Sequence, residues 1–487
     1  MELSELYKLF EQHPTITTDS RDCPAGSIFF ALKGASFDGN KFAAASLEKG
    51  CAYAVIDESE YAVDGDSRFI IVDDCLQTLQ LLARYHRRQL GTPVIGITGT
   101  NGKTTTKELA SAVLGEKYNV LFTQGNFNND IGVPKTLLRL RPEHDIAVVE
   151  MGASHPGDIK TLVDIVEPDY AIITNVGRAH LQGFGSFEGV IRTKGELYDF
   201  MRAHIVEPRA TAANAGHDSF VAAHPRTVFI DNDNQYLKGI SHDLPLTSYG
   251  RGDEAGLAIK GHALSCEPML SFQWNDARKE ADHTVYDVST HLIGDYNLAN
   301  MLAAVTIGTY FDVAPSQICH ALSAYVPSNN RSQFEKTESN SLIVDAYNAN
   351  PTSMAAALAN FETIEAQHKM CIIGDMKELG SVSHDEHQRI VDQLAGMRLE
   401  QVWLVGEEFE NCSTPATFRK FDNVAQVKEA IAEHKPQGMY ILVKGSNGTH
   451  CGAQAAGNVH PREGKQRYTT LRAAAVSLNH IHTIVRK

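Results

Sequence analysis

The chain has 487 residues, which is enough for about three domains of ordinary size. Its 43% apolar content lets each domain bury a core, and its formal net charge of −15 argues against general binding to nucleic acid or to a membrane surface. Eight cysteines are scattered without a Cys-x-x-Cys pair, which indicates reduced thiols in a cytoplasmic protein. We expect neither a secretion signal nor a membrane span, because no apolar run of suitable length is present.

Residues 1–91 predict a small α/β unit. Helices are expected at 3–10, 41–49 and 75–90, and strands at 27–32, 52–57 and 69–72. Gly91-Thr-Pro93 then forms a short linker to the next unit.

From residue 92 to 327, strands and helices alternate as in a doubly wound parallel sheet. Strands are expected at 93–98, 119–123, 145–150, 169–174 and 227–230, followed by an antiparallel excursion at 256–292 and a helix to about residue 311. Ligands of such sheets collect beyond the carboxyl ends of the strands, so the residues after each strand are informative.

The first of these strands leads into a glycine-rich turn, Gly99-Thr-Asn-Gly-Lys-Thr-Thr105, with a helical pattern from Thr106. A strand, a glycine turn and a helix N-terminus form an anion site, because free N–H groups and the helix dipole favour negative charge. Lys103 can reach the outer phosphates of a nucleotide, and the Thr104 hydroxyl can ligate Mg²⁺. Ile97 breaks the strict phosphate-loop spacing and leaves an ordinary turn as the alternative, but the flanking strand and helix favour phosphate binding.

Two further polar residues follow strands of the same sheet. Glu150 ends the third strand, and His180 stands in the loop after the fourth. A carboxylate and an imidazole beside phosphates can hold a divalent metal. Taken alone, each is more simply a capping or loop residue, but both on one rim with a phosphate loop favour a metal site.

A third α/β unit is expected at 328–487, after a linker near Val326–Gln333. Its strands end in polar residues: Asp345, Asp375 and Lys444. Two polar rims on separate domains can face each other across a cleft whose closure excludes water. The last stretch, 451–487, is rich in Gly, Arg and His, so we expect it to be partly disordered and to carry no catalytic residue.

These blocks together resemble the Mur ligase family, the ATP-dependent amide ligases of cell-wall precursor assembly. The resemblance covers residues 15 to about 450 in the family's three-domain order. It rests on Thr-Asp-Ser-Arg (18–21), the Gly99–Thr105 loop, Glu150, Asn-Val-Gly-Arg-Ala-His (175–180), Lys-Gly-Glu-Leu (194–197) and Asp-Tyr-Asn (295–297).

Within the family, the Gly125–Pro134, Asp345–Met354 and Gly374–Gly380 blocks are similar to the member that joins D-alanyl-D-alanine to UDP-N-acetylmuramoyl-tripeptide. The resemblance implies that ATP phosphorylates the tripeptide carboxylate and that the dipeptide amine then displaces phosphate. One alternative is the sister ligase that adds the third amino acid, although its Asp-Asn-Pro-Arg motif is missing here. Another is a P-loop nucleotide switch without ligase chemistry, which leaves Glu150 and His180 unexplained.

The resemblance also implies roles for single residues. ATP would be held by Gly99, Thr100, Asn101, Gly102, Lys103, Thr104, Thr105, Asn297, Arg331 and Asp345. Mg²⁺ would be held by Thr104 and Glu150 on the nucleotide side, and by His180 with a carbamylated Lys194 on the substrate side; a solvated helix lysine is the alternative for Lys194. The catalytic residues are then Lys103, His180 and Lys194.

For the substrate, the resemblance implies Ser20 and Arg21 at the uridine end, with Asn126, Asn129, Ser154, Asn348 and Asn350 toward the peptides. The expected partners are the UDP-linked tripeptide and D-alanyl-D-alanine, with no nucleic acid and no membrane span. We expect a cytoplasmic monomer.

Overall fold

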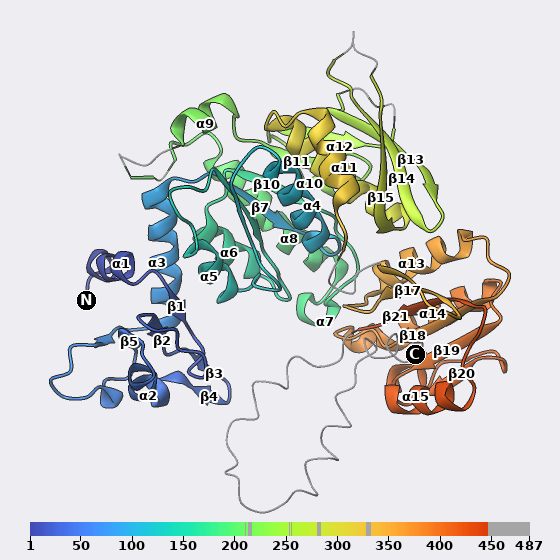
Figure 1. Ribbon diagram of the computed structural model, residues 1–487, viewed down its shortest axis with the longest axis horizontal. Coiled ribbons are helices and arrows are strands. Elements are labelled where there is room, and N and C mark those ends of the chain that lie inside the picture. Colours follow the sequence, from blue (N-terminus) through green and yellow to red (C-terminus); the bar gives the residue numbers. More distant parts are fainter. Residues whose placement is uncertain are drawn as a thin grey trace, which may run out of the picture.

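The computed structural model describes residues 1–209, 211–212, 217–252, 254, 256–279, 284–327 and 333–446. Arg331 and the 451–487 tail, both singled out from the sequence, lie outside the described residues. Three larger sheets follow one another along the described chain, and the central sheet lies between the other two (Figure 1). Among the described helices, none combines the length and the apolar character that crossing a bilayer requires.

The first unit is built on a parallel sheet with the order β1-β2-β5-β6. Its elements are α1 (Leu3–Gln12), β1 (Ile16–Thr17), β2 (Ile28–Phe30), β3 (Lys33–Gly34), β4 (Phe37–Asp38), α2 (Ala43–Glu48), β5 (Tyr53–Ile56), β6 (Phe69–Ile71) and α3 (Cys75–Leu90). The expected helix at 41–49 begins as a 3₁₀ turn, Gly39–Phe42, before α2.

The central sheet has nine strands in the order β15-β14-β13-β12-β11-β10-β7-β9-β8. Its strands are β7 (Val94–Thr98), β8 (Val120–Phe122), β9 (Ile146–Glu150), β10 (Tyr170–Ile173), β11 (Val228–Asp231), β12 (Leu246–Gly250), β13 (Ile259–Cys266), β14 (Met269–Asp276) and β15 (Tyr286–Ile293). Among the described strands of this sheet, only the β13–β14 and β14–β15 pairs are antiparallel. The expected antiparallel excursion is therefore confirmed, but it extends the parallel sheet, because β13 also pairs in parallel with the unexpected strand β12.

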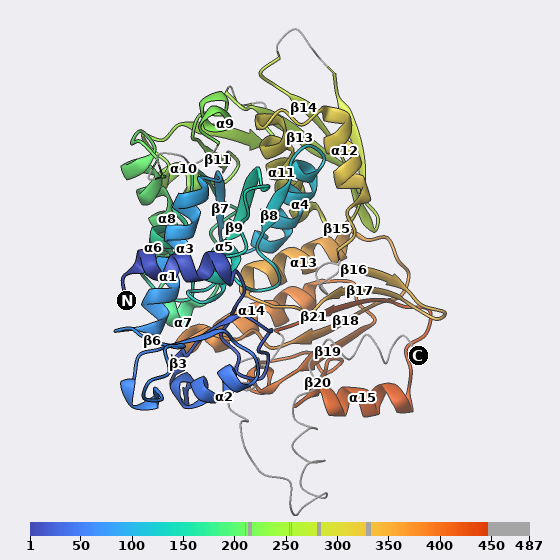
Figure 2. The ribbon, with the colours of Figure 1, turned by 60° about the vertical axis from the view of Figure 1, so that its left-hand side comes forward.

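Helices cover both faces of this sheet (Figures 1 and 2). They are α4 (Lys103–Gly115), α5 (Gly132–Leu137), α6 (Asp158–Val166), α7 (Leu181–Phe184), α8 (Phe187–His204), α9 (Asp218–Ala223), α10 (Gln235–Ile240), α11 (Leu298–Tyr310) and α12 (Pro315–Ala324). Successive residues of a strand point to opposite faces, so a strand covered on both sides is apolar throughout. In β9, Ala147 and Val149 join the core with α5, α6 and α8, whereas Ile146 and Val148 join the core with α4 and α11.

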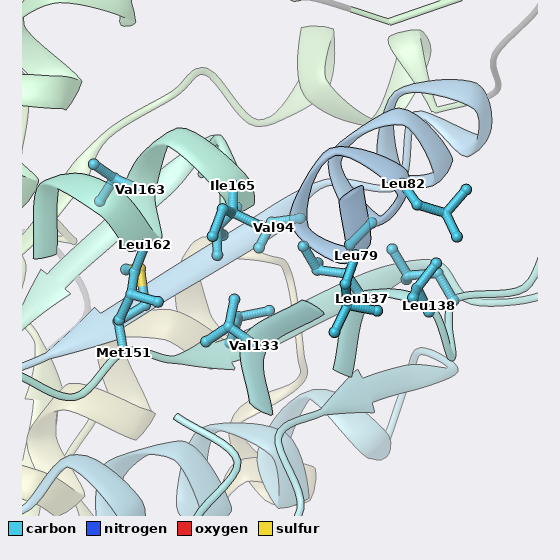
Figure 3. Packing of buried hydrophobic residues seen from close by; sticks show 14 of the residues in the cluster. Leu79, Leu82, Val94, Val133, Leu137, Leu138, Met151, Leu162, Val163 and Ile165 are labelled. Atoms are coloured by element: carbon cyan, nitrogen blue, oxygen red, sulfur yellow. The ribbon is translucent and has the colours of Figure 1, made fainter. Parts of the chain in front are cut away.

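Helix α3 packs both against the first sheet and against helices of the central unit. Its Leu79 and Leu82 share one apolar cluster with Val133 and Leu137 of α5 and with Ile165 of α6 (Figure 3). The same cluster continues into the first sheet. The first and central sheets are thus joined by a continuous hydrophobic core.

Buried polar contacts strengthen the same junction. The His86 ring receives a hydrogen bond from the Tyr7 hydroxyl at Nδ1 (3.1 Å) and donates one from Nε2 to the Leu140 carbonyl (3.0 Å). Burial lowers the pKa of His86 to about 4, so the ring is neutral in the fold. Arg87 is buried and donates to the Asp169 carboxylate at 3.0 Å.

The third sheet has the order β16-β17-β21-β18-β19-β20, and only the β16–β17 pair is antiparallel. Its elements are β16 (Gln333–Lys336), β17 (Ser341–Asp345), α13 (Pro351–Thr363), β18 (Lys369–Gly374), α14 (Ser383–Gly396), β19 (Gln401–Val405), β20 (Arg419–Phe421), α15 (Val424–Glu433) and β21 (Tyr440–Lys444). One face packs on α13 and α14, and the other packs on α15. The expected α/β class is confirmed in all three units.

Candidate active site

A cleft of about 960 Å³ lies at the carboxyl ends of the central strands and also borders the third sheet. It collects most of the residues expected at the site: Thr100, Asn101, Gly102, Lys103, Thr104, Thr105, Asn126, Asn129, Glu150, Ser154, His180, Asn297, Asp345, Asn348 and Asn350. These residues come from both sides of the cleft, so two polar rims do face each other as the strand-end pattern indicated.

The phosphate loop joins β7 to α4 through two glycines in the left-handed region, Gly99 (φ +144°) and Gly102 (φ +77°). A Cβ on Gly99 would lie 2.0 Å from Thr174 Oγ1, and one on Gly102 would lie 2.4 Å from Asn300 Oδ1. Both positions therefore require glycine. Helix α4 starts at Lys103, three residues before the expected start at Thr106, because the loop closes directly into the first turn.

Lys103 folds back over this loop. Its ammonium donates to the carbonyl of Gly99 at 2.7 Å and to that of Thr100 at 3.0 Å. The cation thus lies beside the N-terminus of α4, whose free N–H groups favour an anion. The loop, the helix and the lysine form one positively polarised surface in an acidic protein.

Glu150 ends β9 and is 1% exposed. Its Oε1 accepts hydrogen bonds from Thr104 Oγ1 (3.2 Å) and Asn128 Nδ2 (2.9 Å), whereas Oε2 is buried without a donor among the described residues. The described chain has no group of three His, Cys, Asp or Glu residues that could hold a metal by itself. Mg²⁺ commonly uses one carboxylate together with phosphates and water, so the carboxylate and hydroxyl present fit this ion.

His180 faces the third unit. It precedes α7, which lies between the central and third sheets in Figure 1, and its Nδ1 contacts a carboxylate oxygen of Glu378 in a very short hydrogen bond. Both residues have left-handed backbones, with φ of +51° and +63°. Such conformations are strained for residues other than glycine and are frequent at functional sites. His180 as a metal ligand stays a prediction, and Glu378 is an additional site residue that the sequence reasoning missed.

Other polar contacts link the same two units. The Arg178 guanidinium pairs with the buried Glu386 carboxylate at 2.8 Å, and its backbone N–H donates to Thr352 Oγ1 at 2.9 Å. Asn350 donates from Nδ2 to Asn101 Oδ1 at 2.7 Å, which connects α13 with the phosphate loop. Around the cleft the central and third units are therefore joined by polar groups, whereas Ile293 of β15 packs into the apolar core of the third unit.

Lys194 lies on α8 and is 2% exposed, which contradicts the solvated-lysine alternative. Its Nζ is 5.5 Å from the centre of the Phe184 ring. Burial, and secondly the charge of Lys103, lower the pKa of Lys194 well below its ordinary value. A lysine held as a neutral amine is nucleophilic and can form a carbamate with CO₂.

The remaining expected residues lie in two groups. Asn297 is buried at the start of α11, and Asp345 forms a short ion pair with Lys444 across β17 and β21. Ser20 and Arg21 lie in the first unit and do not line the cleft; Arg21 is held by Asp19 through a two-pronged contact. The cleft thus gathers most of the described residues expected for the nucleotide and the peptides. Lys194, Ser20 and Arg21 do not line it, and Arg331 lies outside the described residues.

Models of one family match the three parts of the chain. The model described as Mur ligase family, catalytic domain, matches residues 14–87, the Mur ligase middle domain matches 97–308, and the Mur ligase, glutamate ligase domain, matches 330–447. The chain belongs to the Mur ligase family.

Its relatives include UDP-N-acetylmuramoyl-tripeptide–D-alanyl-D-alanine ligases. That of Bacillus subtilis (strain 168) is 33% identical over 446 residues, covering 89% of this chain and 90% of the relative, and that of Escherichia coli (strain K12) is 32% identical over 440 residues, covering 88% and 90%. Among solved structures, MurF from Acinetobacter baumannii superposes with a TM-score of 0.75 at 30% identity, covering 90% of this chain and 91% of that one. MurF ligase from Thermotoga maritima in complex with ADP shares the fold, with a TM-score of 0.73 at 24% identity, covering 89% and 94%.

Proposed function

We propose that this chain is the ATP-dependent ligase that joins D-alanyl-D-alanine to UDP-N-acetylmuramoyl-tripeptide in peptidoglycan precursor synthesis. The observation that carries the proposal is one cleft lined by the phosphate loop and Glu150 of the central unit and by Asn348 and Asn350, between β17 and α13 of the third unit. The relatives of this name, matched over about nine-tenths of both chains, support the same reaction.

The reaction requires two transfers. The tripeptide carboxylate attacks the γ-phosphorus of ATP, the bond to the bridging oxygen breaks, and ADP leaves with the electron pair. The dipeptide nitrogen then attacks the acyl carbon, phosphate leaves with the C–O electron pair, and the nitrogen loses a proton to solvent. Both steps bring anions together, so the protein must supply positive charge and exclude water.

The central rim supplies that charge. The phosphate loop and Lys103 bind the phosphates, and Thr104 with Glu150 would hold Mg²⁺ between them. Bound Mg²⁺ neutralises charge that collects on the transferred phosphoryl group. We assign Asn297 and Asp345 to the nucleoside, and Asn126, Asn129 and Ser154 to the muramoyl-peptide; all five line the cleft.

Lys194 is proposed to act as a carbamate. The burial and lowered pKa described above support it, because only the neutral amine reacts with CO₂. We also propose domains at 1–91, 92–327 and 328–487, uridine binding by Ser20 and Arg21, and a monomer in the cytoplasm.

Phosphate release tests the reaction. Purified protein with ATP and Mg²⁺ is given UDP-muramoyl-tripeptide with D-alanyl-D-alanine, or with single amino acids. Release that requires both the tripeptide and the dipeptide, with formation of the pentapeptide product by mass, is the expected result. Release with a diamino acid on the shorter UDP-muramoyl-dipeptide would identify the sister ligase instead, and no release with any acceptor would refute ligase activity.

A further inference from the structure

The strand order of the central sheet sets the direction in which a nucleotide lies. Phosphates bind after β7, and β9 on one side of it ends in Glu150 beside the amide-rich loop. On the other side come β10, β11 and β12. Neighbouring strands are about 4.8 Å apart, so the end of β11 is about 10 Å from that of β7. The nucleoside therefore extends toward β11 and β12, where α11 begins.

Asp231 is the last residue of β11, and it lines the main cleft. It also lines a second cavity of about 370 Å³, to which Tyr249, Gly250 and Leu302 contribute. Both cavities share Asp231 and Ala299, so they meet at this point of the rim. A group that enters from the phosphate side reaches the Asp231 side chain at the junction.

The Asp231 carboxyl has acceptor capacity to spare. Its Oδ1 accepts from the backbone N–H of Asp233 at 3.0 Å, and Oδ2 receives no hydrogen bond within the described part of the chain. The nearby Arg251 is paired with Asp295 instead. Burial raises the pKa of Asp231 to about 6, because the Asp233 N–H and the charge of Arg251 only partly offset the cost of burying the carboxylate.

Asn297, assigned above to the nucleoside, is already engaged by the protein. Its Nδ2 donates to the Ile293 carbonyl at 2.8 Å, and its Oδ1 accepts from Asn300 Nδ2 at 2.9 Å. These contacts hold the start of α11 and leave Asn297 with fewer hydrogen bonds to offer a ligand. On the side of the rim where the nucleoside extends, the Asp231 carboxylate has an oxygen available as an acceptor.

We propose that Asp231 is a specificity-determining residue of the nucleotide site, whose carboxylate accepts a hydrogen bond from the exocyclic amine of adenine. Guanine carries a carbonyl oxygen at the corresponding position, and two acceptors repel each other. A buried polar group left unpaired by the wrong ligand selects strongly against it. The inference rests on the proposed function, because it assumes that the nucleotide is ATP.

The test measures nucleoside diphosphate binding by calorimetry, with Mg²⁺ and near neutral pH, so it does not depend on ligase turnover. The probes are ADP, GDP and purine riboside diphosphate, which lacks only the exocyclic amine. We expect the unaltered protein to bind ADP about tenfold or more tightly than either of the other two. In Asp231→Asn the amide can rotate to offer a donor to guanine while its oxygen keeps the contact to Asp233, so the ADP-to-GDP ratio should fall to within about threefold. Asp243→Asn is the control: this exposed carboxylate lines neither cavity and has a left-handed backbone that Asn tolerates, so the ratio should stay unchanged.

Equal affinity of the unaltered protein for ADP and purine riboside diphosphate would overturn the proposal, and this comparison holds even if the variant does not fold. An unchanged ADP-to-GDP ratio in a folded Asp231→Asn variant would also overturn it. Binding of ADP without base selection refutes only the role of Asp231, whereas no binding of any nucleotide refutes the proposed function with it.

Discussion

Replacing Glu150 by Gln should move stability and activity in opposite directions. In the protein without Mg²⁺, the buried Oε2 has no donor among the described residues, and an unsatisfied buried polar atom costs about 1–3 kcal/mol, more when charged. Gln keeps the acceptor used by Thr104 and Asn128 and removes the charge. Its new N–H group also lacks a partner, which offsets part of the gain. We expect a net stabilisation of about 1 kcal/mol, or a rise in Tm of roughly 1–2 °C for a cooperative block of this size.

With Mg²⁺ and ADP present, we expect the unaltered protein to be more stable than the Glu150→Gln variant. The unaltered protein should gain stability from Mg²⁺ with ADP, because a ligand that binds only the folded state shifts unfolding by mass action. Glu150→Gln should lose most of this gain, since the carboxylate that fits the ion is gone. Its phosphate release should fall about 10²–10³-fold, the usual effect of removing one preorganised electrostatic contact.

Thermal unfolding with and without Mg²⁺ and ADP, together with phosphate release, measures both effects. Glu143→Gln, at an exposed position, is the control and should change neither. The reasoning fails if Glu150→Gln unfolds at a lower temperature than the unaltered protein in the absence of Mg²⁺. It also fails if the variant keeps the full Mg²⁺-dependent rise.

Three further changes test other parts of the structure. Lys103→Ala should remove several powers of ten of turnover, whereas Lys8→Ala, on an exposed face, should not; turnover of the first within tenfold would contradict the phosphate-loop assignment. Lys194→Ala should lose activity and regain part of it with short carboxylates, and full activity without rescue would refute the carbamate. His86 is neutral in the fold with a pKa of about 4, against about 6.5 when unfolded, so stability is complete above pH 6.5 and falls by up to about 3 kcal/mol as the pH drops toward 4. Urea unfolding of His86→Gln across this range should show a smaller pH dependence, and an equal slope would argue against the buried neutral ring.

Local sequence patterns predicted those parts of the candidate site that come from one continuous segment of the chain. The phosphate loop was found because its glycines, Lys103 and Thr104 stand together in seven residues between a strand and a helix. Glu150 and His180 were found because parallel strands place their ends on one rim. Strand β12 was missed, since Leu-Thr-Ser-Tyr-Gly has no apolar run and forms only by pairing with β11 and β13.

Long-range contacts could not be predicted from such patterns. Glu378 stands 198 residues from His180 in the sequence, so nothing local indicates that they meet. Glu378 belongs to the Gly374–Gly380 block. This block indicates the family by resemblance, but it does not indicate which distant residues its side chains contact. Asp231 ends a predicted strand like the other rim residues, and the same reasoning could have selected it. Burial of Lys194 depends on how α8 lies against its neighbours, which the helix pattern alone does not determine.

The continuous core between the first and central sheets makes the two boundaries between units unequal: the first and central units share an apolar core, and the third unit lies outside it. A chain that starts after residue 91 would lack α3 and expose the apolar side chains of α5 and α6 that it covers (Figure 3). A chain that ends before the third sheet would keep this core whole. It would lose polar contacts such as Asn101–Asn350 and Arg178–Glu386, and the packing of Ile293 against the third unit. Residues 1–327 should therefore melt as one cooperative block and the third sheet as another. Any large hinge motion that opens the cleft then belongs to the third sheet, because an interface with many polar contacts separates more readily than an extended shared apolar core.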